Sequence, residues 1–335
     1  MRRVPLIVMT CVLALLGLSA CGTTEPAPTA PPAVGAPGSA APAAPATGPV
    51  TLTDARGKQV TLPRPATRVV TLEWNVTEHV ASLGVMPIGA ADVAGYQKWV
   101  SDVPIDASVK DVGVRGEPSI DSIAALRPDL VLATDELPEA AVTQMEAFAP
   151  VVFVPGGTSA DPIGQMKRNT ALIGQALGKD AEASNQVAAF DAKVADGRSR
   201  LAPRAGQPFV FADAYVEAGQ VSIRPFTDGS LVGAVTSGLG LTNAWTEPGD
   251  ETYGLAQTDV EGLTRAGTAN FLYILNDGDG GDVFRNELGT NAVWQSLPFV
   301  KENRVNRLPD GIWYFGGPVS MQRYVDATVT ALTRT

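Results

Sequence analysis

Histidine and cysteine are almost absent from this sequence. Its 335 residues include one histidine, His79, and two cysteines, Cys11 and Cys21. So few cannot build a zinc site rich in histidine or cysteine, and they cannot form a disulfide framework. We therefore expect no metal site of the protein's own and no bound cofactor. Any metal that the protein handles should arrive inside another molecule's chelate.

Positive charge is also scarce. Lysine and arginine number 25 against 35 aspartates and glutamates, which gives a formal net charge of −10. A protein that binds nucleic acid needs a basic face to neutralise phosphates, so no nucleic-acid partner is expected. The acidic stretch 276–282 lacks the glutamate that closes a calcium-binding EF-hand loop, and we interpret it as an exposed turn.

Enzyme signatures are missing as well. The sequence has no Gly-x-Ser-x-Gly nucleophile elbow and no Gly-x-x-x-x-Gly-Lys phosphate loop. His79, the base that a serine hydrolase would need, lies in a predicted helix and is interpreted as a packing or surface residue. The residues therefore indicate a binding protein rather than an enzyme.

No apolar run reaches the about 20 residues that span a bilayer. The longest run, 6–18, follows Arg2 and Arg3 and precedes Leu-Ser-Ala-Cys at 18–21. This pattern is typical of a secretory signal, and its end is similar to the bacterial lipobox. We predict that residues 1–20 are removed and that Cys21 becomes the lipidated first residue. The alternative is an ordinary signal peptide with an incidental cysteine.

Residues 21–49 consist almost entirely of alanine, proline, glycine and threonine, with Glu25 as the only charge. Such a segment buries too little apolar surface to offset the entropy of ordering. We predict a disordered tether that holds the folded body, residues 50–335, at the outer face of the cytoplasmic membrane. The protein would then be extracytoplasmic and anchored by its lipid.

Strands and helices alternate along the body, which predicts an α/β fold with mainly parallel sheets. Expected strands are 50–53, 59–62, 68–72, 85–90, 129–133 and 151–154, and expected helices are 77–83, 119–126 and 139–148. The segments 230–240, 259–263 and 270–275 repeat this order, which indicates a second lobe of related design. Helices at 161–177 and 180–201 connect the halves. The predicted organisation is an N-terminal lobe, a bridging helix and a C-terminal lobe at 50–178, 179–202 and 203–335.

Aromatic side chains and one arginine gather at predicted turns. They are Trp74, Tyr96, Trp99, Arg115, Tyr253, Trp313, Tyr314 and Phe315. In open α/β sheets, ligands bind in the loops beyond the carboxyl ends of the strands. Aromatic walls and a cation suit a bulky, partly apolar ligand with oxygen acceptors. The alternative for each ring is packing against a sheet core.

Several motifs carry a family resemblance. They include Glu73-Trp74, Leu83-Gly84-Val85-x-Pro87-x-Gly89, Tyr96-x-x-Trp99-Val100, Val112-Gly113-x-Arg115-x-Glu117-Pro118, Trp294-Gln295-x-x-Pro298-Phe299 and Trp313-Tyr314-Phe315-Gly316. Together they cover essentially all of the body. They resemble the ABC-transporter solute-binding proteins for ferric siderophores, with the ferric hydroxamate binders nearest in pattern.

The resemblance implies two Rossmann-like lobes bridged by one long helix, the class III or helical-backbone metal-receptor architecture. A ferric siderophore would lie in a cleft between the lobes. The resemblance implies that Arg115 contacts hydroxamate oxygens and that the pocket is walled by Trp99, Tyr253, Trp313, Tyr314 and Phe315, beside which the turn positions add Trp74 and Tyr96 as candidate ligand contacts. It also implies that Glu139 and Glu261 dock onto arginines of a membrane permease, with helix capping as the alternative. We expect a monomer that delivers its ligand to an ABC importer.

The chain also departs from the hydroxamate binders. Asp135-Glu136-Leu137 stands where they have a tyrosine that contacts the ligand, Tyr253 stands at a family tryptophan, and Phe315 at a family tyrosine. The same transport role with heme, cobalamin or a catecholate siderophore is the main alternative. The single histidine disfavours heme, and the absence of a basic cluster disfavours anionic catecholates. A lipid-anchored hydrolase or a surface sensor is the other alternative.

Overall fold

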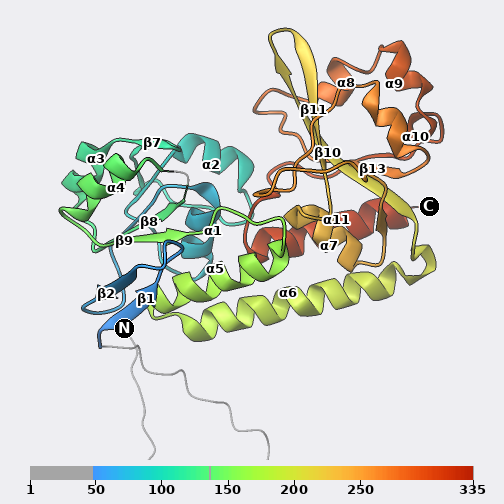
Figure 1. The fold of residues 1–335 in the computed structure, drawn as a ribbon. Coiled ribbons are helices and arrows are strands. Elements are labelled where there is room, and N and C mark those ends of the chain that lie inside the picture. Colours follow the sequence, from blue (N-terminus) through green and yellow to red (C-terminus); the bar gives the residue numbers. More distant parts are fainter. Residues whose placement is uncertain (1–47, 136, 335) are drawn as a thin grey trace, which may run out of the picture. The chain divides into compact units, whose positions relative to one another are not determined.

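Two open sheets flanked by helices make up the body of the protein in a computed structural model, which describes residues 48–135 and 137–334 (Figure 1). Both sheets belong to one compact unit of the chain. The predicted α/β fold is confirmed. The predicted signal segment, Cys21 and nearly all of the predicted tether lie outside the described residues. Within those residues, every helix is too short or too polar to cross a membrane.

The first sheet, which defines the N-terminal lobe, is entirely parallel and has the strand order β5–β4–β3–β8–β9. Its strands are β3 (Val69–Thr71), β4 (Gly89–Ala90), β5 (Lys110–Asp111), β8 (Leu130–Thr134) and β9 (Val151–Val154). Strands β3, β8 and β9 are buried along their whole length, as expected for parallel strands covered on both faces. The chain order reverses between β3 and β8, so a ligand is expected beyond the carboxyl ends of these two strands.

Helices and two hairpins complete this lobe and lead out of it. The antiparallel hairpins are β1 (Val50–Thr53) with β2 (Gln59–Leu62), and β6 (Gly113–Val114) with β7 (Glu117–Pro118). The helices are α1 (Trp74–Ser82), α2 (Val93–Trp99), α3 (Ile120–Leu126), α4 (Glu139–Glu146), α5 (Pro162–Leu177) and α6 (Asp180–Arg200). Ser119 caps α3, because its side chain accepts a hydrogen bond from the Ser122 N–H.

The second sheet, which defines the C-terminal lobe, is mixed and has the order β11–β10–β13–β14, with β12 also paired to β10. Its strands are β10 (Pro208–Glu217), β11 (Gln220–Phe226), β12 (Thr242–Asn243), β13 (Asn270–Tyr273) and β14 (Val305–Arg307). Strands β10 and β11 form a long antiparallel hairpin, and the other neighbours are parallel. The helices are α7 (Leu231–Gly238), α8 (Val283–Asn286), α9 (Ala292–Ser296), α10 (Pro298–Lys301) and α11 (Pro318–Thr333), with 3₁₀ turns η1 (Ala202–Arg204) and η2 (Gly262–Ala266).

The long helix α6 joins the two lobes and runs past both of them (Figure 1). Ala183 and Phe190 lie on its buried face. Gly197 continues this buried face, and a Cβ there would lie 2.8 Å from side-chain atoms of Leu239 and Val325. A glycine at this point therefore allows α6 to approach α11 and the end of α7 closely.

Two helix boundaries near the expected ligand position were predicted wrongly. Helix α1 begins at Trp74 rather than at residue 77, because the Glu73 side chain accepts a hydrogen bond from the Trp74 N–H and caps the helix. Tyr96 and Trp99 lie on helix α2 rather than in a loop, because the Asp92 side chain caps that helix at Gly95 N–H. Both aromatic residues are thus held on a regular element.

The expected likeness of the two halves is only partial. The strand predicted at 85–90 is reduced to the two residues of β4. The segment 259–263, expected to mirror the helix 119–126, precedes and enters the five-residue 3₁₀ turn η2. Gly267 ends that turn with a φ of 55°, a left-handed conformation that favours glycine. The chain therefore stops the turn before a full helix can form.

Candidate functional site

An arginine and a tryptophan meet beyond the carboxyl end of β3. The β6–β7 hairpin carries Arg115, whose Nη1 donates to Glu73 Oε1 at 2.8 Å. The guanidinium carbon lies 3.8 Å from the ring centroid of Trp74, a stacked cation–π geometry. The Arg115 side chain is 35% exposed, whereas Glu73 is 14% exposed. Because the bond to Glu73 uses one of five N–H donors, the guanidinium can still bind ligand oxygens.

Aromatic rings from both lobes form one continuous cluster beside this arginine. Trp74 meets Trp313 edge-on with centroids 4.9 Å apart, and Trp99 lies 6.2 Å from Trp313. On the C-terminal side, Phe315 lies 5.2 Å from Trp313 and 5.4 Å from Tyr253. The structure thus brings together six of the predicted aromatic residues with Arg115: Trp74, Trp99, Tyr253, Trp313, Tyr314 and Phe315.

These rings differ in how far they are open to solvent. Trp99, Tyr253 and Phe315 are half-buried, whereas Trp313 is nearly buried at 6% exposure. The indole N–H of Trp313 is buried and has no hydrogen-bond partner among the described residues. A buried donor of this kind normally finds an acceptor, so the N–H is available for an oxygen that enters the cluster.

Tyr96 does not lie with the others. Its side chain is fully buried, and its hydroxyl donates to the Val103 carbonyl oxygen at 2.7 Å. Burial raises the pKa of this phenol above its usual range. The expectation that Tyr96 contacts a ligand is therefore not met in this structure. The residue sits on the inner face of α2, where helical spacing turns it toward the core.

A second arginine in the C-terminal lobe escaped the sequence analysis. Asp213 on β10 is 2% exposed and accepts hydrogen bonds from Arg224 Nε at 2.9 Å and from the Tyr314 hydroxyl at 3.0 Å. Arg224 on β11 is 34% exposed and lies 5.5 Å from the ring centroid of Tyr215. The signal in the sequence was an aspartate inside an apolar strand, because a buried carboxylate needs a cation nearby.

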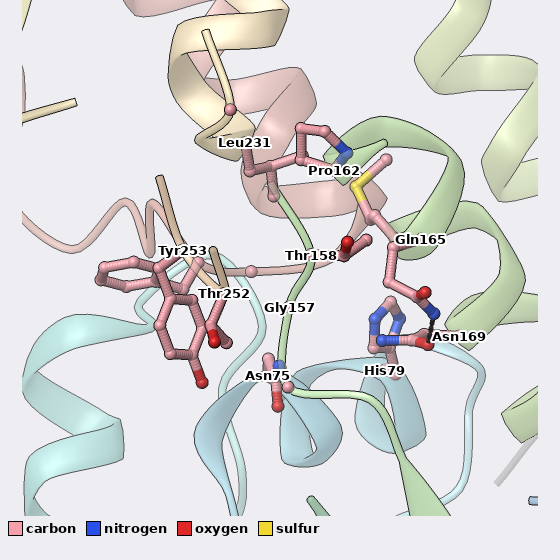
Figure 2. A pocket seen from close by; sticks show the side chains of 15 residues that line it. Asn75, His79, Gly157, Thr158, Pro162, Gln165, Asn169, Leu231, Thr252 and Tyr253 are labelled. Atoms are coloured by element: carbon pink, nitrogen blue, oxygen red, sulfur yellow. Dashed lines mark hydrogen bonds between the residues drawn. The ribbon is translucent and has the colours of Figure 1, made fainter. Parts of the chain in front are cut away.

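Tyr253 and Phe315 also line a small cavity of about 40 Å³ between the lobes, shown in Figure 2. Asn75 lines it, and its side-chain oxygen is buried without a hydrogen-bond partner among the described residues. His79 also lines it, and burial lowers the pKa of this imidazole to about 4, so the ring is neutral at neutral pH. The cavity has room for a few water molecules and none for an iron chelate.

A buried carboxyl joins α1 of the N-terminal lobe to α11 of the C-terminal lobe. Glu78 Oε1 accepts from the Ser320 N–H at 3.0 Å, and Oε2 accepts from the Ser320 hydroxyl at 2.9 Å. Burial raises the pKa of Glu78 to about 7, although the bonds from Ser320 favour the ionised form. Glu78 therefore supplies the side-chain acceptor that the N-terminus of α11 lacks in its own cap, Gly317.

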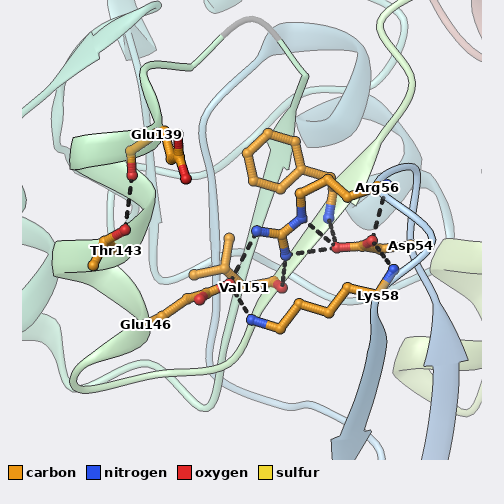
Figure 3. Close-up of polar contacts among 8 residues, drawn as sticks. Asp54, Arg56, Lys58, Glu139, Thr143, Glu146 and Val151 are labelled. Carbon is orange, nitrogen blue, oxygen red and sulfur yellow. Dashed lines mark hydrogen bonds and ion pairs between the residues drawn. The ribbon is translucent and has the colours of Figure 1, made fainter.

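Glu139, one of the two acidic residues expected to dock on a permease, is exposed in the first turn of α4. At the other end of α4, Glu146 forms ion pairs with Arg56 at 3.0 Å and Lys58 at 2.7 Å (Figure 3). These pairs tie the helix to the β1–β2 hairpin. Glu139 is thus presented at the surface by an anchored helix.

Glu261, the second of these residues, is exposed immediately before η2 and makes no side-chain cap bond. A 3₁₀ turn of five residues has a weaker dipole than a long helix, so capping explains Glu261 less well than it explains Glu139. No group of three or more metal-binding side chains occurs in the part of the chain that the structure describes.

Comparison with known proteins gives a consistent result. Residues 69–311 match the family model described as periplasmic binding protein. The iron(3+)-hydroxamate-binding protein FhuD of Escherichia coli (strain K12) is 24% identical over 261 residues, which cover 77% of this chain and 84% of that protein. The "probable siderophore-binding lipoprotein YfiY" of Bacillus subtilis (strain 168) is 23% identical, with 93% of each chain covered.

Solved structures agree. The siderophore-binding protein FhuD of Vibrio cholerae with bound Fe³⁺–Desferal superposes with a TM-score of 0.70 and 26% identity. The alignment covers 79% of this chain and 97% of that one. The likeness therefore extends over both lobes and the helix that joins them.

Replacing Glu78 by glutamine tests the buried carboxyl. Because its pKa is raised from 4.5 to about 7, Glu78 contributes stability that is fully present below pH 4.5 and is lost as the pH rises through 7. The glutamine does not titrate. From pH 6.5 to about pH 8.5, wild type should therefore lose roughly 0.8 kcal/mol more free energy of unfolding than Glu78→Gln. Urea unfolding at the two pH values measures this difference.

The lowered pKa of His79 does not interfere, because its contribution is fully present above pH 6.5 and is lost only as the pH falls through about 4. An exposed carboxyl, Glu261→Gln, serves as the control and should follow wild type. If the free energies of unfolding of wild type and Glu78→Gln changed equally with pH, the raised pKa of Glu78 would be contradicted.

Proposed function

The chain belongs to the periplasmic binding protein family, and we propose that it captures a ferric siderophore of the hydroxamate type and delivers it to an ABC importer. The observation that carries this proposal is Arg115, held by Glu73 and stacked on Trp74 at the edge of an aromatic cluster built from both lobes. Aromatic walls suit the apolar arms of such a chelate, and the guanidinium suits the oxygens around its iron. The relative from E. coli, named for iron(3+)-hydroxamate, supports the same cargo.

The charge of the site favours a hydroxamate over a catecholate. Three singly charged hydroxamates cancel the charge of Fe³⁺, whereas three doubly charged catecholates leave a triple negative charge. Each arginine beside the cluster is already paired with a carboxylate, Arg115 with Glu73 and Arg224 with Asp213. The local charge is therefore near zero, which suits a neutral chelate. Heme is disfavoured because His79, the one histidine, is buried.

The remaining parts of the proposal concern delivery. The protein would bind and release its cargo without catalysis, as a monomer, with no cofactor. Cys21 would carry the lipid that holds the body at the outer face of the cytoplasmic membrane, and the segment 21–49 would be the tether. Incorporation of a labelled fatty acid by wild type, and not by Cys21→Ser, tests the anchor.

Arg115→Ala tests the ligand site. Quenching of tryptophan fluorescence by ferrioxamine B, a trihydroxamate whose iron centre is uncharged, should saturate for wild type, and a ferric tris-catecholate should quench far more weakly. Loss of a charge-assisted hydrogen bond should weaken the affinity of Arg115→Ala by about tenfold to a hundredfold. Arg64→Ala removes the same charge from an exposed loop and should bind as wild type does. Unchanged affinity in Arg115→Ala would remove the arginine from the site, and no quenching of wild type by any trihydroxamate would refute the cargo.

The double variant Glu139→Ala, Glu261→Ala tests docking. Because both carboxylates lie at the surface, the variant should bind ferrioxamine B with wild-type affinity. Cells that carry the cognate permease and this variant should take up ferrioxamine B at least about tenfold more slowly than cells with wild type, because two charge pairs of the docking interface are lost. Glu182→Ala, an exposed change on α6, is the control. If cells with the double variant took up ferrioxamine B at the wild-type rate, the two residues would not dock on the permease and would act elsewhere, for example in helix capping.

A further inference from the structure

The acidic turn 276–282 reaches from the C-terminal lobe to the end of α2. Asp279 Oδ2 accepts a hydrogen bond from the Trp99 indole N–H at 2.8 Å, and Oδ1 lies 3.4 Å from Lys98 Nζ. Asn276 Nδ2 donates to the Lys98 carbonyl oxygen at 2.7 Å. The centre of the turn is exposed, as the sequence predicted, but Asn276 and Asp279 have partners on the other lobe.

Arg307 at the end of β14 holds this turn in place. Its guanidinium forms ion pairs with Asp277 at 2.8 Å, with Asp310 at 2.7 Å and with the buried Asp282 at 3.3 Å. The Asp277 N–H also donates to Asp310 Oδ2 at 2.9 Å. Two loops of the C-terminal lobe, 276–282 and 307–311, are therefore joined through one arginine.

The loop 307–311 is also hydrogen-bonded to the N-terminal lobe. Ser101 N–H and the Ser101 hydroxyl donate to the Gly311 carbonyl oxygen at 3.0 Å and 3.2 Å. A Cβ at residue 311 would collide with the Ser101 hydroxyl, and the φ of Gly311 is 77°. The backbones can therefore approach this closely only at a glycine. Together the contacts of residues 98–101 with the two loops form a clasp between the lobes.

We propose that Asp279 is a positioning residue for the ligand site, which it serves by fixing the indole of Trp99 across this clasp. The inference rests on the proposed function, because it takes the Trp99 ring as part of the siderophore wall. The ring is half-buried and packs edge-on against Trp313 and Tyr314 at 6.2 Å and 6.1 Å. The indole N–H is the only polar group of the Trp99 side chain. A carboxylate on the facing lobe that accepts its hydrogen bond therefore sets the rotation of the ring and the separation of the two walls.

A wall fixed in this way is preorganised, so the site loses less conformational entropy when a ligand binds. The Lys98 pair adds little by itself, since both partners are about half exposed. The hydrogen bond from Trp99 is the part that matters, because it is directional and has a charged acceptor. Asn at residue 279 would keep an acceptor for the indole, whereas Ala would not.

Three single variants, one double variant and a control test the proposal. In Asp279→Ala the affinity for ferrioxamine B should fall about three- to tenfold, the loss expected for one partly exposed hydrogen bond to a charged group. In Asp279→Asn it should stay within about twofold of wild type. Trp99→Phe keeps a ring but lacks the N–H, so adding Asp279→Ala to it should have little further effect. Glu287→Ala removes the same charge from the same lobe and should not alter binding.

Hydrogen exchange without ligand separates this inference from the proposed function. The amides of residues 98–101 should exchange at least about threefold faster in Asp279→Ala than in wild type, and at the wild-type rate in Asp279→Asn. If wild type binds no trihydroxamate but the three proteins show this exchange pattern, the role of Asp279 in the clasp is supported and the proposed cargo is refuted. If wild type binds and Asp279→Ala binds equally well, or if exchange is unchanged, the positioning role is overturned.

Discussion

The site exists only where the two lobes meet, and one buried contact brings its two walls together. Glu78 lies one turn after Trp74 on α1, and its carboxyl accepts two hydrogen bonds from Ser320 in the first turn of α11. The aromatic run Trp313 to Phe315 directly precedes α11. A fully buried carboxyl is costly unless it is hydrogen-bonded, and here the N-terminus of a helix from the other lobe supplies the donors. This contact therefore holds α1, which carries Trp74, against the helix that follows Trp313, Tyr314 and Phe315.

The positive charges near the aromatic cluster are balanced by neighbouring carboxylates. Both arginines near the aromatic cluster are held by carboxylates of low exposure, so the site offers hydrogen-bond donors without a strong positive field. This arrangement is consistent with the negative charge of the whole chain, −10, which would repel an anionic chelate at long range. Selectivity for a neutral ligand would then come from two sources, the local pairing of charges and the field of the whole molecule.

Much of the architecture was readable from local patterns. The buried runs of β8 and β9 and the helices α3, α5 and α6 appeared within a few residues of their predicted bounds, because strand burial and helix caps are encoded by neighbouring residues. Arg115 and the aromatic residues were singled out by their place after strands and by the family resemblance. Helix α2 was missed because its cap, Asp92, has a φ of 50°, an uncommon conformation that gives no clear sequence signal.

The sequence by itself determined the class of the protein: an α/β body free of cysteine, with a single histidine and a set of aromatic residues that include the run Trp313 to Phe315. Only the tertiary structure decided which of those residues act together. It buried Tyr96, joined Asp213 to Arg224 and Tyr314, and set Asp279 against Trp99. These outcomes depend on residues about 10 to 180 positions apart in the chain. Composition and periodicity report local preferences, whereas such contacts are selected by tertiary packing, within the C-terminal lobe for Asp213 and between the lobes for Asp279.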